Sequence, residues 1–205
     1  MKDGFLIVGA LNPGASVADP AENARGLASL ARRAAEAGIS VLATPELALT
    51  TATAGDLVLS SCLIASVEAA LRAYLDETAD LDLLSFVGLP VALDGKLYNA
   101  AAAAFRGRLL GLVPKRGADG RFAAAPEENR VVSYAGETCL FGVRQLFVCS
   151  GVPRITVACE IGDDLLSPVP PSVGHAAAGA TLIVGLAADP ETIGRAAFRR
   201  DLVAL

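Results

Sequence analysis

The sequence predicts a layered α/β fold with a mixed β-sheet. Short apolar runs typical of buried strands alternate along the 205 residues with segments whose apolar residues recur at helical spacing. Two strand-like segments near the middle are separated by a tight turn, which indicates an antiparallel pair inside the sheet. The composition agrees, because 53% of the residues are hydrophobic and 19% are charged, as in a globular chain with a substantial core.

The first elements are a strand at residues 5–10 and a helix that starts after Asp19. Asp19 is a good N-cap, Pro20 suits the first helical position, and Glu22 completes a pair like that of a capping box. Gly38 is a natural stop for this helix.

The middle of the chain predicts a second helix and four strands. Apolar residues at helical spacing mark the helix, at Ile64, Val67, Leu71 and Tyr74. Strands are expected on either side of it, at residues 40–44 and 83–88. Residues 96–105 and 108–113 are expected to form a hairpin, because Arg106-Gly107 separates two strand-like runs.

The second half predicts a long loop followed by alternating strands and helices. Residues 116–136 are polar, rich in alanine and interrupted by glycine and proline, so a loop is expected there. The elements expected after it are strands at 145–149, 155–161 and 181–186, a short helix at 171–179 and a final helix at 191–205. No repeat or linker divides the chain, so residues 1–205 are expected to form a single domain.

Charge and composition exclude several classes of function. The net charge is −5 and no basic stripe is visible, so no nucleic-acid partner is expected. No apolar run suits a membrane span and no secretory signal is recognisable, so neither a membrane nor export is expected. The four cysteines form no Cys-x-x-Cys pair, which indicates reduced thiols in a cytoplasmic protein. Nucleotide-binding glycine motifs and metal-ligand clusters are absent, so no cofactor or metal is expected.

Several segments resemble, in order and spacing, the nitrilase superfamily of carbon–nitrogen hydrolases. Glu160 to Leu165 is similar to the stretch that carries the nucleophile in this family, Thr44 to Thr50 to the stretch that carries a glutamate, and Gly107 to Lys115 to the strand that precedes a lysine. Further similar segments lie in the same order at residues 88–90, 97–99, 178–181 and 191–195. The similarity is greatest to the N-terminal glutaminase domain of glutamine-dependent NAD synthetases.

This resemblance implies a nitrilase-like α-β-β-α sandwich that is shortened at its C-terminus. In the family, the helix that matches Arg199-Arg200 is followed by further strands and by a separate ATP-using synthetase domain. That domain carries a Ser-Gly-Gly-x-Asp-Ser loop, which this sequence lacks. The synthetase domain is therefore expected to be absent.

The resemblance also implies where the site lies. Glu46 and Lys115 match the family's catalytic glutamate and lysine, and thiol-dependent amide hydrolysis needs a base and an oxyanion-stabilising group beside its nucleophile. Gly162 stands where the family has its nucleophilic cysteine. The neighbouring Asp163 is expected to contact the substrate, and Asp164 to have a structural role.

Other polar residues near these motifs are weaker candidates. Cys159 could supply a thiol, but strand residues an odd number apart point to opposite faces, so a structural role is expected. A supporting glutamate of the family falls at Ala123, and Glu127 or Glu128 could replace it only if the loop took a different path. His175, the one histidine, is expected on a helix surface.

The sequence therefore predicts a degenerate or fragmentary glutaminase-type amidase domain that acts as a binding or assembly module. The alternative is an active amide hydrolase, converting glutamine to glutamate and ammonia, with a relocated thiol nucleophile. A third interpretation is a remodelled fold in which small residues replace the side chains of the pocket. A small amide such as glutamine is the expected ligand. A homo-oligomer, most simply a two-fold dimer, is expected because an apolar chain without the family's C-terminal segments leaves surfaces to cover. The expected contacts are the final helix around Phe198 and Leu202 and the region after Cys159.

Overall fold

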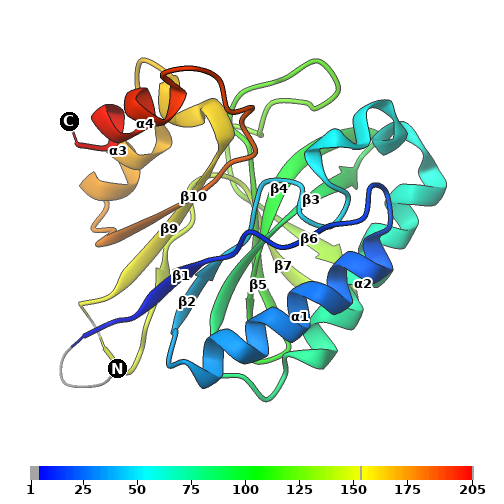
Figure 1. Cartoon of the computed structure of the whole chain (residues 1–205), viewed down its shortest axis with the longest axis horizontal. Coiled ribbons are helices and arrows are strands. Elements are labelled where there is room, and N and C mark those ends of the chain that lie inside the picture. Colours follow the sequence, from blue (N-terminus) through cyan, green and yellow to red (C-terminus); the bar gives the residue numbers. More distant parts are fainter. Residues whose placement is uncertain (1–4, 153, 205) are drawn as a thin grey trace.

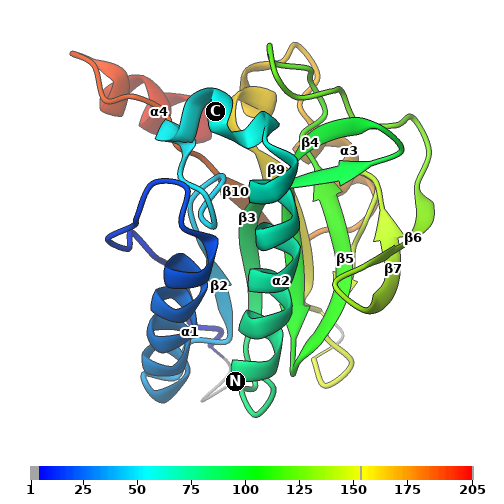
Figure 2. The same cartoon turned by 90° about the vertical axis from the view of Figure 1, so that its right-hand side faces the viewer.

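A computed structural model of the chain describes residues 5–152 and 154–204. Two β-sheets lie face to face (Figure 1). Helices α1 and α2 pack on the outer face of the larger sheet, and α3 lies against the smaller one (Figure 2). The predicted α-β-β-α sandwich is confirmed.

The larger sheet has seven strands in the order β1-β2-β3-β4-β5-β7-β6, and the smaller has three in the order β10-β9-β8. The strands are β1 Val8–Ala10, β2 Val41–Ala43, β3 Leu84–Leu93, β4 Lys96–Phe105, β5 Arg108–Pro114, β6 Arg130–Tyr134, β7 Glu137–Phe141, β8 Phe147–Val148, β9 Thr156–Ile161 and β10 Leu182–Leu186. The helices are α1 Pro20–Glu36, α2 Ser61–Glu77, α3 Pro171–Ala177 and α4 Arg195–Ala204, with short 3-10 segments η1 Ala52–Leu59 and η2 Gly162–Leu166. The larger sheet is mixed, as predicted, because β1 to β3 are parallel while β3, β4 and β5 are antiparallel.

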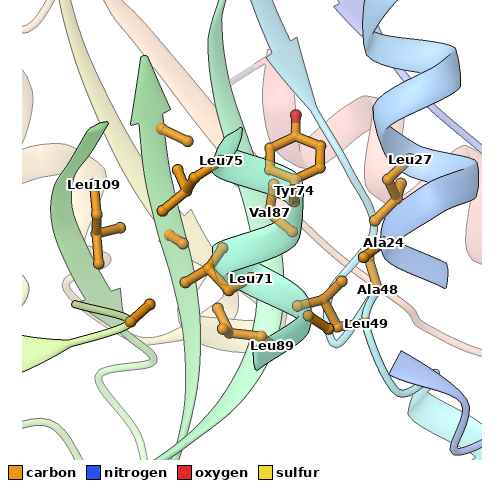
Figure 3. Close-up of a cluster of buried hydrophobic side chains, with 14 of the residues drawn as sticks. Ala24, Leu27, Ala48, Leu49, Leu71, Tyr74, Leu75, Val87, Leu89 and Leu109 are labelled. Atoms are coloured by element: carbon orange, nitrogen blue, oxygen red, sulfur yellow. The ribbon is translucent and has the colours of Figure 1, made fainter. Parts of the chain in front are cut away.

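Strand β4 separates two hydrophobic cores because its small side chains alternate between them. Ala100, Ala102 and Ala104 belong to the core under α1 and α2, whereas Ala101 and Ala103 belong to the core between the sheets. Alanine on both faces lets the layers on either side approach this strand closely. The first core is drawn in Figure 3 and includes Leu27, Leu71, Tyr74, Val87 and Leu89.

Helix α1 begins and ends where its sequence predicts. Asp19 Oδ1 accepts a hydrogen bond of 3.1 Å from the Glu22 N–H, and Pro20 is the first helical residue. After the helix, Gly38 adopts a φ of +84°, a conformation that glycine reaches without strain.

Tight hairpins join the antiparallel strands of the larger sheet. The predicted turn at Arg106-Gly107 is confirmed, with φ values of +47° and +75°. Two similar turns at Asp94-Gly95 and Ala135-Gly136 were not expected. Both central residues of each turn have positive φ, as type I′ turns require. The turn at Asp94-Gly95 could have been predicted, because an Asp-Gly pair between two apolar runs indicates a hairpin.

The strand expected at residues 5–10 is shorter and more exposed than predicted. Strand β1 covers only Val8–Ala10, and Phe5, Ile7 and Val8 are 75%, 46% and 51% exposed. The expectation of a buried strand was wrong because β1 lies at an edge of the larger sheet, where only one neighbouring strand covers it.

Other boundaries also differ from the expectations. Strand β3 continues to Leu93, beyond the strand expected at 83–88, and β7 was not expected. The end of the expected loop at 116–136 forms β6, which pairs with β7. Only two residues of the strand expected at 145–149 form β8, and the Gln145 backbone N–H instead donates a hydrogen bond of 2.9 Å to Val143 O. Helix α4 starts at Arg195 and not at Glu191, after Gly194 with a φ of +84°.

Within the described residues, no single helix has the length and apolar character to cross a membrane. The bent pair of η1 and α2 passes the same test of length and composition when the two are taken together.

Candidate active site

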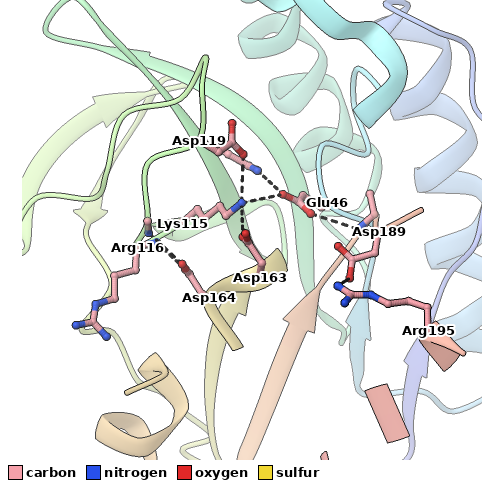
Figure 4. Close-up of polar contacts among 11 residues, drawn as sticks. Glu46, Lys115, Arg116, Asp119, Asp163, Asp164, Asp189 and Arg195 are labelled. Carbon is pink, nitrogen blue, oxygen red and sulfur yellow. Dashed lines mark hydrogen bonds and ion pairs between the residues drawn. The ribbon is translucent and has the colours of Figure 1, made fainter. Parts of the chain in front are cut away.

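The structure brings Glu46, Lys115 and Gly162 together at one end of the sandwich. Glu46 follows β2, Lys115 follows β5, and Gly162 follows β9 of the smaller sheet. Lys115 Nζ lies 4.0 Å from Glu46 Oε1, and a Cβ added to Gly162 would lie 3.0 Å from Glu46 Oε2. The site is thus built where strands of both sheets end (Figure 4).

The Glu46 carboxylate is held at both oxygens. Asn99 Nδ2 donates a hydrogen bond of 2.5 Å to Oε1, and the Ala188 N–H donates one of 3.2 Å to Oε2. The side chain is 11% exposed. Burial raises the pKa of Glu46, although the hydrogen bond from Asn99 and the charge of Lys115 act in the opposite direction. The result is a fixed carboxylate that is a stronger base than an exposed one.

A close backbone approach fixes the loop that carries Glu46. A Cβ on Gly88 of β3 would lie 2.2 Å from Pro45 O and 2.7 Å from Leu47 N, so only glycine fits there. The Gly88 N–H donates a hydrogen bond of 3.0 Å to Thr44 Oγ1. Gly88 therefore sets the position of Glu46 from the neighbouring strand.

Lys115 is the cation of the site and is surrounded by carboxylates. Its side chain is 8% exposed, and Nζ lies 2.6 Å from Asp163 Oδ1 and 3.2 Å from Asp119 Oδ2. Burial by itself lowers the pKa of this amine. The hydrogen bonds to Asp163 and Asp119 and the charge of Glu46 outweigh it, so the pKa of Lys115 is raised and the ammonium form persists.

The adjacent aspartates have different environments. The side chain of Asp163 is 60% exposed, and its hydrogen bond with Lys115 lowers its pKa. Asp164 is buried and accepts backbone hydrogen bonds of 2.6 Å from Arg116 and 3.0 Å from Gly117. Burial raises the pKa of Asp164 although these two bonds act against it. Asp163 is therefore open to solvent beside Lys115, while Asp164 anchors the segment that follows Lys115.

Gly162 adopts a backbone conformation that disfavours a side chain. Its φ is +58°, in the left-handed region. The nearest atoms to an added Cβ are the two carboxylate oxygens of Glu46, at 3.0 and 3.1 Å. Backbone and neighbour thus both select glycine here.

The thiol nearest in sequence is buried elsewhere. Cys159 is 1% exposed in the core between the two sheets, with Val157 and Ile161 of the same strand. Burial raises the pKa of its thiol, so the reactive thiolate is disfavoured. Among the described residues, Cys139 is also buried, while Cys62 and Cys149 are exposed.

The sequence does not single out two side chains that touch the site. Asn99 lies in one of the family-like segments, yet its contact with Glu46 joins residues 53 positions apart. Asp119 is a further acidic side chain beside Lys115, with its Oδ2 3.2 Å from Nζ. The only feature of the sequence that could have indicated Asp119 as a site residue is its spacing of four residues from Lys115.

His175 does not lie on a helix surface, and that expectation was wrong. It is 5% exposed, and its Nε2 lies 3.0 Å from Val143 O. Within the described residues, no group of three or more His, Cys, Asp or Glu side chains is arranged to hold a metal ion.

Comparisons with known proteins show sequence relatives over almost the whole chain. It is 36% identical over 209 residues to the glutamine-dependent NAD(+) synthetases of Mycobacterium bovis and Mycobacterium tuberculosis, and 34% identical to that of Mycobacterium leprae. These matches cover 98% of this chain and 31% of each relative, so the chain spans about a third of their length. No family model matches the chain.

Solved structures share the fold at lower identity. A glutamine-dependent NAD(+) synthetase from Cytophaga hutchinsonii superposes with a TM-score of 0.82 at 22% identity, covering 97% of this chain and 33% of that one. A mutant of the Nesterenkonia AN1 amidase, from the nitrilase superfamily, gives a TM-score of 0.68 at 19% identity, covering 94% and 69%. The chain is therefore a relative of the glutamine-dependent NAD(+) synthetases with the fold of the nitrilase-superfamily amidases, which confirms the resemblance seen in its motifs.

Proposed function

We propose that residues 1–205 form one glutaminase-type domain that binds a small amide without hydrolysing it. The observation that carries the proposal is the position of the Glu46 carboxylate, which lies 3.0 Å from where a Cβ on Gly162 would be. The proposal equates Gly162 with the nucleophile position of the amidases. Glycine has no side chain, so it cannot attack a carbonyl carbon. Glu46 then occupies the space that a nucleophile would need.

The remaining groups suit amide recognition. The Lys115 ammonium can donate a hydrogen bond to the amide oxygen, and the Glu46 carboxylate can accept one from the amide nitrogen. Asp163 is exposed beside Lys115 and can accept a hydrogen bond from an amino group, as glutamine carries. Relatives named for glutamine dependence make glutamine the first ligand to test.

The alternative is an active amide hydrolase with a relocated thiol. Cys159 is the thiol nearest in sequence, and its burial between the sheets and its raised pKa both act against it. A nucleophile needs the thiolate and access to the substrate, and Cys159 has neither in this conformation.

Ammonia release and ligand binding separate the two functions. We expect no ammonia above background when the chain is incubated with glutamine, and saturable glutamine binding by calorimetry that Lys115→Met abolishes. Gly162→Cys alone should remain inactive, since Glu46 obstructs the new side chain. Turnover by the unmodified chain that Cys159→Ala removes would establish the hydrolase. Absence of both turnover and glutamine binding would reject an amide-binding role.

The proposal also includes assembly and location. Helix α4 has no buried residue, and Phe198 and Val203 on it are 46% and 74% exposed. We assign this surface to a second copy of the chain, because apolar groups gathered on one exposed helix are a common interface signal. The cysteines of the described residues are all free thiols, which suits a reducing compartment such as the cytoplasm.

A further inference from the structure

A cavity lies beside Arg116, the residue that follows Lys115. Its volume is about 750 Å³, within the range of small-molecule sites. The side chain of Arg116 points away from the Lys115 cluster (Figure 4) and lines this cavity. Helix α3 and the segments 125–127 and 143–146 supply most of the other walls.

Two arginines in this cavity have donors to spare. Arg116 uses one guanidinium nitrogen to bond Val169 O, out of the five N–H donors that the group carries. The hydrogen bonds of Arg144 with described residues involve its backbone N–H and carbonyl oxygen and not its guanidinium. Glu127 also lines the cavity and forms no ion pair within the same described part of the chain. The walls thus carry two positive charges and one negative charge, in a protein whose net charge is −5.

The backbone around both arginines is fixed before any ligand binds. Asn129 clamps Arg144, with its Nδ2 2.5 Å from the Arg144 carbonyl oxygen and its Oδ1 3.2 Å from the Arg144 N–H. The Arg116 N–H donates a hydrogen bond of 2.6 Å to the buried Asp164. His175 of α3 contacts Val143 O and so joins the helix to the opposite wall.

Apolar groups complete the lining. Val143, Leu146, Val169 and Pro171 all face the same cavity. A purely inorganic ion would leave these groups facing water, whereas a ligand with an apolar body would cover them. Guanidinium groups bind carboxylate and phosphate in paired, directional hydrogen bonds.

We propose that this cavity binds a small organic anion, with its carboxylate or phosphate between Arg116 and Arg144 and its apolar body against α3. The site is separate from the amide site in its ligand chemistry. It is linked to that site through the backbone, because Arg116 follows Lys115 directly and bonds the aspartate next to Asp163. It does not depend on whether the amide site is active.

The test compares benzoate, phenyl phosphate and the neutral benzamide in NMR titrations of the full chain. We expect the anions to bind and to shift the amide signals of Val143 and His175, while benzamide gives no saturable shift there. The tighter of the two anions identifies the preferred head group. Arg116→Gln and Arg144→Gln should each weaken anion binding by about tenfold, and Glu127→Gln should strengthen it.

Arg33→Gln is the matched control, because Arg33 is exposed on α1 and does not line the cavity. It should leave both anion affinities unchanged. Thermal melts followed by circular dichroism check that each variant folds. Equal affinities in all variants, equal binding of benzamide and benzoate, or shifts confined to the residues around Lys115 would each overturn the proposal. So would the lack of any saturable binding by either anion at millimolar concentration.

Discussion

The Glu46 carboxylate occupies the space that a side chain on Gly162 would need. A Cβ at position 162 would lie 3.0 Å from Oε2 and 3.1 Å from Oε1, which is tighter than nine in ten real contacts of a Cβ. Glu46 is itself held by Asn99 and the Ala188 N–H, so it cannot yield without losing a hydrogen bond. The two positions are therefore coupled, and each restricts what the other can be.

Gly162→Ala should destabilise the fold by about 1–2 kcal/mol, because a Cβ is disfavoured at a φ of +58° and must also displace Glu46. Urea unfolding of both proteins measures the difference. Gly26→Ala is the matched control, since an added Cβ meets nothing within 4 Å there and Gly26 lies inside α1. It should instead stabilise by about 0.5–1 kcal/mol. Equal stability of Gly162→Ala and the unmodified chain would contradict the coupling.

Glu46→Gln should stabilise the protein at pH 7. The folded-state pKa of Glu46 is raised above its ordinary value of 4.5, so the folded state favours the protonated carboxyl and ionisation at neutral pH costs stability. Asn99 Oδ1 is buried without a partner among the described residues, so a flipped Asn99 amide can accept a hydrogen bond from the amide of the introduced glutamine.

Unfolding of Glu46→Gln and of the unmodified chain across a pH series tests whether the folded-state pKa of Glu46 is raised. The advantage of the glutamine variant should shrink as the pH falls from 7 through the folded pKa of Glu46, because the native carboxyl then becomes neutral too. A variant that is less stable at pH 7, by a margin that shrinks as the pH falls, would show instead that Glu46 acts as a stabilising anion.

Lys115→Met should destabilise by about 1–3 kcal/mol, because it leaves three carboxylates without their shared cation. This loss of stability is smaller than that expected for a fully buried ion pair, since the side chains of Asp119 and Asp163 are 41% and 60% exposed. Lys115 lowers the pKa of Asp163 below 3.8, so part of this loss should vanish as the pH falls through that lowered pKa. Lys96→Met, at an exposed position that starts β4, is the control and should change the unfolding free energy little.

Gly88→Ala should destabilise by about 1–3 kcal/mol or more, because its Cβ would lie 2.2 Å from Pro45 O and force the Glu46 loop to move. Glutamine affinity should fall with stability, since the loop carries a proposed ligand group. Gly185→Ala in β10 is the control, because an added Cβ meets nothing within 4 Å there. It measures the change in stability when a strand glycine is replaced by alanine without a clash. Similar effects of the two substitutions would mean that the Gly88 contact relaxes easily.

Local sequence signals predicted the parts of the fold that local chemistry determines. The cap at Asp19 and the turn at Arg106-Gly107 depend on neighbouring residues, and both were predictable. The exposure of β1 was not, because an apolar run does not tell whether a second strand or layer covers it. Strand β6 was not predicted, because it lies in a segment whose glycine and proline content favoured a loop. It forms a strand through its pairing with β7.

The same distinction applies to the site. Glu46 and Lys115 were proposed from segments that resemble a family, and the structure places them 4.0 Å apart. Asn99 was not predicted as a site residue, because a neutral amide indicates no particular function until its hydrogen-bond partner, here Glu46, is known. His175 was misplaced because the helical pattern of seven residues does not show which face is covered.

The exposed face of α4 gives the last prediction, which concerns assembly. None of the residues of α4 is buried, and Phe198 is 46% exposed with the Arg195 guanidinium 5.3 Å from its ring centre. Sedimentation of the purified chain at micromolar concentration should show a dimer that dissociates on dilution. Phe198→Glu should shift it to monomer, because a carboxylate at the centre of an apolar contact loses its hydration without gaining a partner.

Val131→Glu is the matched control for this interface, since Val131 is 69% exposed on β6 and outside α4. It should leave the dimer intact. If both substitutions dissociate the dimer, the interface extends beyond α4, because a helix contact alone would not respond to a charge on β6. A chain that sediments as a clean monomer at every concentration would show that α4 needs no second copy, and the assembly part of the proposed function would then be wrong.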